Sequence, residues 1–68
     1  MKPNGTAIRA LRKARNAGLR KLSRETGLDR GYLSRLERGL AGARAGTVER
    51  IAAALEVPTA AITHEEQQ

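Results

Sequence analysis

Hydrophobic residues recur along the chain at the three- and four-residue spacing of amphipathic helices, and no segment alternates as a half-buried strand does. The clearest case joins Val48, Ile51, Ala52 and Leu55, at positions i, i+3, i+4 and i+7. Helical periodicity of this kind occurs five times. The pattern therefore predicts an all-α fold, a compact bundle of five helices.

The first predicted helix runs from about Thr6 to Asn16, with Thr6 as its N-cap, and Gly18 breaks the pattern after it. Its predicted apolar stripe consists of Ala7, Leu11 and Ala14, beside Ile8 and Ala10. The second predicted helix, Leu19 to Thr26, is short and is anchored by Leu19 and Leu22.

A tight turn separates the second predicted helix from the third, which covers about Arg30 to Arg38. Gly27 stands where a left-handed backbone conformation requires a residue without a Cβ, and Leu28 is predicted to fill the core beneath the turn. Asp29 is a suitable N-cap, since its carboxylate accepts the free amides of the first turn and complements the helix dipole.

Gly39 ends the third helix, and the glycine-containing residues 40–46 are predicted to form a loop. The fourth helix begins between Arg44 and Thr47, with Thr47 within one turn of its start, and Pro58 ends it.

A last short helix, capped by Thr59, is predicted to bury Ile62, and residues 64–68 form a polar tail. Sixty-eight residues allow one domain with a small core, here about residues 6–63, and a deep, walled active site is hard to build at this size.

Composition argues against catalysis and metal binding. The chain has no cysteine, its histidine is His64 in the predicted tail, and its acids and histidine lack metal-ligand spacing. No glycine-rich phosphate loop precedes a helix. We therefore expect no enzyme activity, no cofactor, no metal and no small-molecule ligand.

No segment indicates a membrane protein. The longest apolar run, Ile51 to Leu55, is far shorter than the roughly 20 residues that span a bilayer, and residues 1–5 lack a signal-peptide core. We expect a soluble, cytoplasmic protein with no membrane partner.

Positive charge is concentrated in one part of the chain. Residues 1–44 contain 12 Lys and Arg against 3 Asp and Glu, whereas residues 45–68 contain 1 against 4, which together give the net charge of +6. Such a surface attracts phosphate backbones, although a merely solvated basic face has the same composition. With Tyr32 as the one aromatic residue, a stacking platform for single strands is disfavoured, and double-stranded DNA is the expected polyanion.

The third predicted helix has a basic side. At 100° per residue, one arc of this helix holds Arg30, Gly31, Ser34, Arg35 and Arg38. Arginine makes bidentate hydrogen bonds to guanine N7 and O6, so Arg30 and Arg35 are predicted to favour G·C-containing half-sites.

We also place Gly31 and Tyr32 with Arg30 and Arg35 in the predicted base-contacting set. Gly31 either permits close approach to DNA or is a neutral surface position. Tyr32 either contacts a thymine methyl group or a phosphate, or is a half-buried ring that fills the groove between the second and third helices.

Residue order carries a family resemblance. The relevant segments are Ile8-Arg9-Ala10-Leu11-Arg12, Leu22-Ser23-Arg24-Glu25-Thr26-Gly27, Tyr32-Leu33-Ser34-Arg35-Leu36-Glu37-Arg38-Gly39 and Ile51-Ala52-Ala53-Ala54-Leu55-Glu56-Val57-Pro58. Over about residues 6–63 the chain resembles the Cro/CI-type, or XRE-type, helix-turn-helix family, with its lambda repressor-like domain. It departs from the family at Gly18, Leu19 and Ser23, where relatives usually have Ser or Thr, Gln, and Ala.

The resemblance implies further roles. Phosphate contacts fall on Arg20, Ser34, Arg38 and Arg44. Arg12 and Glu37 match a partly buried ion pair, for which two exposed charges are the alternative. We assign Lys13, Arg15 and Arg24 to solvent.

The function implied is sequence-specific binding to the major groove of double-stranded DNA by a transcriptional regulator, with repression by operator occlusion. A homodimer on DNA is expected, and the resemblance points to its fourth and fifth helices as the interface. The localisation implied is the cytoplasm, in association with the nucleoid, for a protein of bacterial, phage or plasmid type. Two alternatives stay open, a protein-interaction module such as an antitoxin and an accessory protein that bends DNA with little sequence choice.

Overall fold

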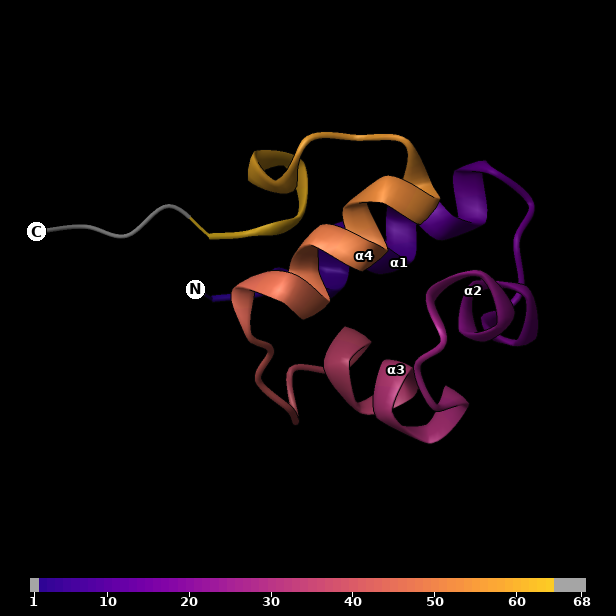
Figure 1. Cartoon of the computed structure of the whole chain (residues 1–68), viewed down its shortest axis with the longest axis horizontal. Coiled ribbons are helices and arrows are strands. Elements are labelled where there is room, and N and C mark those ends of the chain that lie inside the picture. Colours follow the sequence, from indigo (N-terminus) through magenta and orange to yellow (C-terminus); the bar gives the residue numbers. More distant parts are fainter. Residues whose placement is uncertain (1, 65–68) are drawn as a thin grey trace, which may run out of the picture.

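The computed structural model describes residues 2–64 and contains four α-helices and one 3-10 turn (Figure 1). In chain order these are α1 (Gly5–Ala14), α2 (Leu19–Thr26), α3 (Arg30–Glu37), α4 (Ala45–Leu55) and η1 (Thr59–Ile62). The described residues contain no strand, and one isolated antiparallel bridge pairs Pro3 with Thr63. The all-α class is confirmed.

The prediction of a fifth α-helix was wrong. η1 is a single four-residue 3-10 turn, preceded by Pro58 as its N-cap in place of the predicted Thr59. Thr63 directly after it has extended backbone and pairs with Pro3. Four residues between these fixed ends are too few for a ladder of α-helical hydrogen bonds. Ile62 is nevertheless buried, as predicted.

The bounds of α1 also differ from the prediction. Its N-cap is Asn4, whose Oδ1 accepts a hydrogen bond from the Ala7 amide at 3.1 Å, and not Thr6. The helix ends two residues before the predicted Asn16, because Asn16 has a positive φ of 57° that stops the helical path.

The predicted stripe on α1 was wrong in part. Ala10 and Ala14 are exposed, and the buried face consists of Gly5, Ile8 and Arg12. Hydrophobic periodicity does not detect this buried face, because Arg12, a charged residue, is one of its members.

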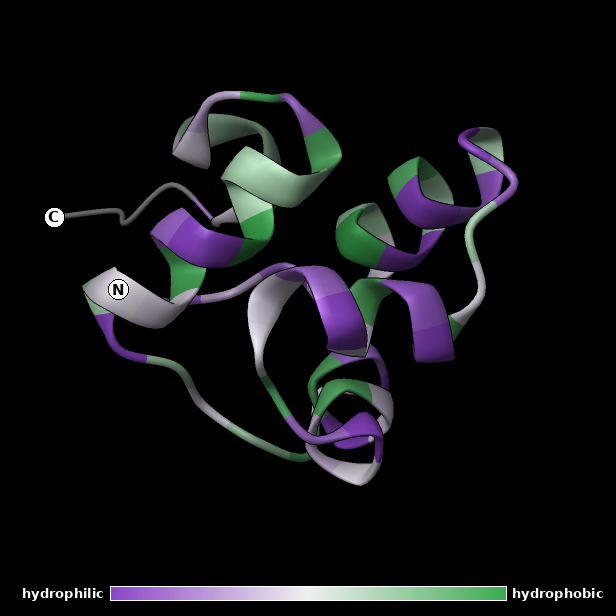
Figure 2. Ribbon diagram, turned by 45° about the vertical axis from the view of Figure 1, so that its right-hand side comes forward, coloured by the Kyte–Doolittle hydropathy of each residue, from purple (hydrophilic) through white to green (hydrophobic). Residues whose placement is uncertain are grey.

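Side chains from all five elements meet in one core. The buried hydrophobic residues of this cluster are Ile8, Leu22, Leu33, Leu36, Val48, Ile51, Ala52, Leu55 and Ile62. In Figure 2 hydrophobic and hydrophilic segments alternate along the helices, as expected for amphipathic elements. Burial of one large hydrophobic side chain stabilises the folded state by about 1.5–3 kcal/mol. Because α4 has four buried positions, it contributes a large part of the stability of the fold.

The turn between α2 and α3 is held by hydrogen bonds from two side chains. The Thr26 hydroxyl donates to the Leu22 carbonyl at 2.8 Å and accepts from the Leu28 amide at 3.2 Å, while the Ser23 hydroxyl donates to the Leu28 carbonyl. Gly27 takes the predicted left-handed conformation, with φ 76°. These bonds fix the direction in which α3 leaves the turn.

Both ends of the described chain lie together, on the side away from α2 (Figure 1). The Asn4 amide donates to the Ile62 carbonyl and the His64 amide donates to the Lys2 carbonyl, each at 2.8 Å. Of the predicted polar tail, residues 65–68 lie outside the described residues. No helix in the part of the chain that the structure describes is long and apolar enough to cross a membrane.

Candidate nucleic-acid interface

The outward side of α3 carries the basic arc that its sequence predicts. Arg30, Gly31, Arg35 and Arg38 are exposed and Ser34 is half-buried, whereas Leu33 and Leu36 on the opposite side are fully buried. The N-cap is Asp29, whose Oδ2 accepts from the Tyr32 amide at 3.2 Å, as predicted. Packing of the apolar side against the core therefore presents the arginines to solvent.

Arg30 and Arg35 have no acidic partner in residues 2–64, where the ion pairs are Arg12–Glu37 and Arg15–Glu56. Their guanidinium groups are free to bind an external acceptor. Such groups can contact guanine edges in pairs of parallel hydrogen bonds.

Gly31 lies close to the side chains of Asp29 and Arg35. A Cβ built at this position would stand 3.0 Å from Asp29 Oδ2 and 3.5 Å from Arg35 Nη1. A side chain at this position would crowd the Asp29 carboxylate that caps α3 and would occupy space next to the Arg35 guanidinium. The glycine leaves both arrangements undisturbed.

Tyr32 is half-buried against the core, and its hydroxyl donates a 2.6 Å hydrogen bond to the Gly42 carbonyl. The ring therefore ties the connection between α3 and α4 to the start of α3. Because the hydroxyl hydrogen is used inside the chain, what Tyr32 offers outward is the exposed part of its ring.

Two helix starts, those of α2 and α4, lack a side-chain cap. Gly18 precedes α2 and Arg44 precedes α4, and neither provides a side-chain hydrogen bond to the first-turn amides. Free amides and the positive end of the helix dipole favour an anion at such a terminus. Arg20, in the first turn of α2, and Arg44 are both exposed at these ends.

Arg38 and Ser34 complete the predicted phosphate-contacting set. Arg38 follows α3 as its C-cap, and its Nε donates to the Ser34 carbonyl at 3.4 Å. This long hydrogen bond leaves the outer nitrogens of the Arg38 guanidinium available.

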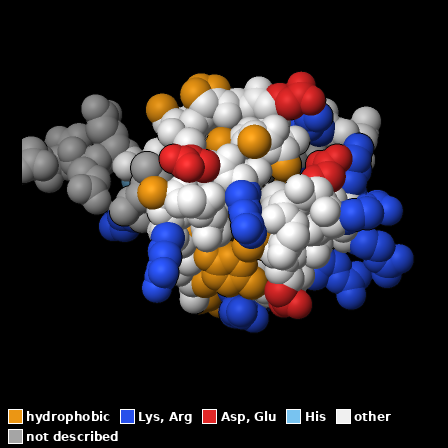
Figure 3. Space-filling model, in the orientation of Figure 1, with side chains coloured by type: hydrophobic (Ala, Val, Ile, Leu, Met, Phe, Trp, Pro, Cys, Tyr) orange, Lys and Arg blue, Asp and Glu red, His pale blue; other side chains and the backbone are white. Residues whose placement is uncertain are grey.

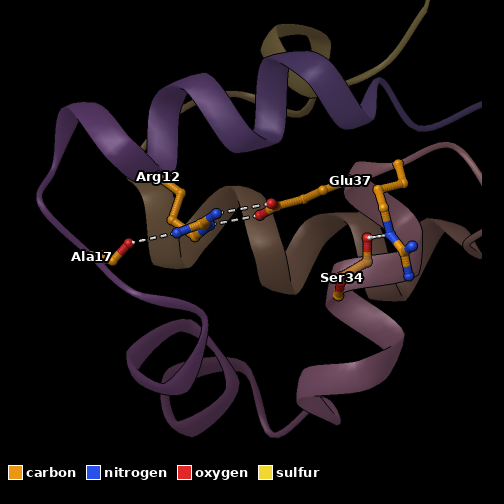
Figure 4. Close-up of polar contacts among 5 residues, drawn as sticks. Arg12, Ala17, Ser34 and Glu37 are labelled. Carbon is orange, nitrogen blue, oxygen red and sulfur yellow. Dashed lines mark hydrogen bonds and ion pairs between the residues drawn. The ribbon is translucent and has the colours of Figure 1, made fainter.

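Arg12 and Glu37 join α1 to the end of α3 (Figure 4). Nε and Nη2 of Arg12 donate to Oε2 and Oε1 of Glu37 at 2.7 and 2.9 Å, and Nη1 donates to the Ala17 carbonyl at 2.9 Å. The two side chains are only 10% and 6% exposed. The hydrogen bonds to Glu37 raise the pKa of the Arg12 guanidinium against the lowering effect of burial, so Arg12 is charged at neutral pH.

Arg15, which the sequence assigns to solvent, is exposed and also forms an ion pair that the sequence analysis did not predict. Its Nη2 forms a 3.2 Å ion pair with Glu56, because the end of α1 lies beside the end of α4. Both partners are largely exposed, so the pair contributes at most about 1 kcal/mol. Lys13 and Arg24 are exposed.

The space-filling view shows how these charges are distributed (Figure 3). On the face shown, Lys and Arg side chains gather along the right and lower edges, over the region where Figure 1 places α2 and α3. Acidic side chains are scattered singly among them. The molecule thus has a predominantly basic side built around the α2–α3 unit.

Comparison with known proteins agrees with this geometry. A sequence model described as the helix-turn-helix domain matches residues 5–64, which is most of the chain. The chain belongs to the XRE-type helix-turn-helix family. No curated protein matches it in sequence.

Solved structures of helix-turn-helix regulators are similar to this domain over most of its length. The restriction-modification controller protein C.AhdI from Aeromonas hydrophila is 30% identical, with a TM-score of 0.81 over 84% of this chain and 86% of that one. The N-terminal DNA-binding domain of SinR from Bacillus subtilis is 28% identical, with a TM-score of 0.82 over 94% of each chain. SinR, a master regulator for biofilm formation, solved in complex with DNA, is 30% identical, with a TM-score of 0.78 over 82% and 90%.

Sequence reasoning missed parts of this helix-turn-helix that depend on close contacts. Gly5 was left outside the first helix, yet a Cβ there would overlap the carbonyl oxygens of Leu36 and Glu37. Thr26 was assigned only as the end of a helix, although it is buried and bonded to the turn. A Ser and a Thr three residues apart before a glycine are a usable signal, because short hydroxyl side chains readily bond nearby backbone.

Proposed function

We propose that this protein binds double-stranded DNA sequence-specifically as a transcriptional regulator, and represses by occluding the sites that it occupies. The observations that carry this proposal are the exposed α3 arginines, which have no acidic partner in residues 2–64, and the two uncapped helix starts, those of α2 and α4. This arrangement suits a helix lying in the major groove with a phosphate backbone on either side of it.

In this proposed complex the interface residues form two groups, one that contacts base edges and one that contacts phosphates. Arg30 and Arg35 read base edges, with the ring of Tyr32 as an apolar contact, and Gly31 lets the start of α3 approach the groove closely. The residues that contact phosphates are Arg20, Ser34, Arg38 and Arg44. The two uncapped helix ends add backbone amides to these phosphate contacts.

We further propose that the protein acts as a homodimer on DNA. One recognition helix reads only a few base pairs, and two-fold dimers place two such helices on half-sites about 34–36 Å apart. A protected region that contains two inverted half-sites at this spacing is the expected footprint.

The alternative of a protein-interaction module has less support. A broad exposed apolar patch over α4 and η1 would favour it. The exposed large hydrophobic residue of the described chain is Leu40, at 65% exposure, and it follows α3 in the connection to α4.

The test is selection of duplexes from a random pool by the purified protein, followed by sequencing and by competition against unrelated duplex. The proposal requires an enriched motif that binds at least about 10³-fold more tightly than random sequence at physiological salt. Strong salt dependence without an enriched motif would indicate the architectural alternative instead.

A further inference from the structure

A hollow of about 180 Å³ opens where α1, the start of α2 and the second half of α3 meet. The residues that line it are Arg9, Arg12, Leu19, Ser34, Glu37 and Arg38. Figure 4 shows the Arg12–Glu37 pair spanning from α1 to α3, with Ser34 on the neighbouring turn of α3. Arg12 and Glu37 neutralise each other, so the net charge of the lining comes from Arg9 and Arg38.

The contacts of the Arg9 side chain indicate no structural role for this residue. It is exposed, and in residues 2–64 no hydrogen bond or ion pair of its side chain is formed. Its neighbour across the hollow, Arg38, makes only the 3.4 Å bond to the Ser34 carbonyl. Two guanidinium groups with free N–H donors therefore face a space that has no free carboxylate.

The third wall adds donors of a different kind. Leu19 begins α2 and has no polar side-chain atom, but Gly18 leaves the amides of this first turn without a side-chain acceptor. Two arginines, the Ser34 hydroxyl and a free helix start together suit a ligand with several anionic oxygens. A phosphate group has this chemistry.

We propose that Arg9 is a phosphate-binding residue that helps to seat one DNA backbone phosphate in this hollow. The inference rests on the proposed function. Ser34 and Arg38 belong both to the hollow and to the outward arc of α3, so a duplex that receives α3 in its groove brings its backbone past Arg9. The hollow is open to solvent and lies beside this basic arc, which favours a phosphate of a polymer over a free anion.

The experiment measures dissociation constants of the full chain against salt concentration, on the selected duplex and on random duplex. Arg9→Gln is expected to weaken binding to both duplexes by the same factor. It is also expected to reduce the slope of the logarithm of the binding constant against the logarithm of salt concentration by about 0.9, the value for one phosphate contact. Arg9→Lys is expected to keep the slope of the wild type. Lys13→Gln is the matched control, since Lys13 lies one turn further along α1, is exposed and does not line the hollow.

Failure of this inference is distinguishable from failure of the proposed function. An unchanged slope in Arg9→Gln, with the wild type still selecting its motif, would overturn the role of Arg9 alone. Absence of any motif would overturn the proposed function, while the slope on random duplex would still test Arg9. Equal slope changes in Arg9→Gln and Lys13→Gln would show a general charge effect and would overturn the proposal that Arg9 binds a phosphate in this hollow.

A free anion is tested separately. Nuclear magnetic resonance titration with inorganic phosphate, against chloride at matched ionic strength, is expected to show no saturable shift at Arg9. Saturable binding of inorganic phosphate without a slope change on DNA would overturn the assignment to the backbone. Thermal melting of each variant at the wild-type temperature is the check that its fold is intact.

Discussion

Removal of the Glu37 carboxylate tests the buried ion pair most directly. In Glu37→Ala, Arg12 loses two of its three hydrogen bonds and keeps only the one to the Ala17 carbonyl. The guanidinium remains charged in a place where its side chain is 10% exposed. Removing one partner of a buried pair costs about 3–5 kcal/mol, and the remaining bond to Ala17 favours the lower end of that range. At about 0.05–0.15 kcal/mol per residue, a chain of 68 residues has a total stability of about 3–10 kcal/mol, so this variant is expected to lose a large part of it and to melt at a clearly lower temperature.

The double variant Arg12→Leu with Glu37→Leu distinguishes two costs in free energy of unfolding: that of leaving Arg12 buried without a partner, and that of losing the ion pair. Two apolar residues can fill the space, and no ion is left without a partner. The Ala17 carbonyl loses its donor in this variant, which costs about 1–3 kcal/mol. We therefore expect the double variant to be more stable than Glu37→Ala, although less stable than the wild type.

Urea unfolding followed by far-UV circular dichroism measures these differences, with Glu49→Ala as an exposed control expected within about 0.5 kcal/mol of the wild type. Glu56→Ala, which breaks the exposed pair with Arg15, is expected to cost at most about 1 kcal/mol. The reasoning is refuted if Glu37→Ala is as stable as these two variants. The Glu37 carboxylate also lines the hollow beside Arg9, and its loss leaves the Arg12 charge unpaired there, so this test is read from stability and not from DNA affinity.

Three other predictions concern the interface and the packing. Arg35→Ala is expected to weaken binding to the selected duplex by about 1–3 kcal/mol and to relax base choice at one position, whereas equal loss on random duplex would make it a phosphate contact. Arg20→Ala and Arg38→Ala are each expected to weaken binding to all duplexes and to reduce the salt slope by about one, and an unchanged slope would remove that residue from the interface. Gly5→Ala is expected to destabilise the fold by about 1–3 kcal/mol or more, because its Cβ would overlap backbone of α3, whereas Gly46→Ala, with open space around it, is expected to be neutral or stabilising in thermal melts.

The elements that the sequence determined by itself are those whose signals are local. Asp29 caps α3 and Gly27 takes the left-handed conformation because the backbone within a few residues requires it. The buried face of α4 follows from its apolar spacing, and the basic arc of α3 follows from helical geometry. Hydrophobic periodicity was sufficient to predict the all-α class, and residue order was sufficient to predict the family.

Only the tertiary structure decided the features that join distant parts of the chain. Whether α1 starts after Asn4 or at Thr6 depends on how closely Gly5 approaches the end of α3, and no local rule contains that distance. η1 is a 3-10 turn because Thr63 is paired with Pro3, which lies at the other end of the sequence. The position of Arg9 beside Arg38 likewise arises from packing. Propensity acts over one turn of helix, whereas these contacts are set by the shape of the shared core, so periodicity alone does not predict them.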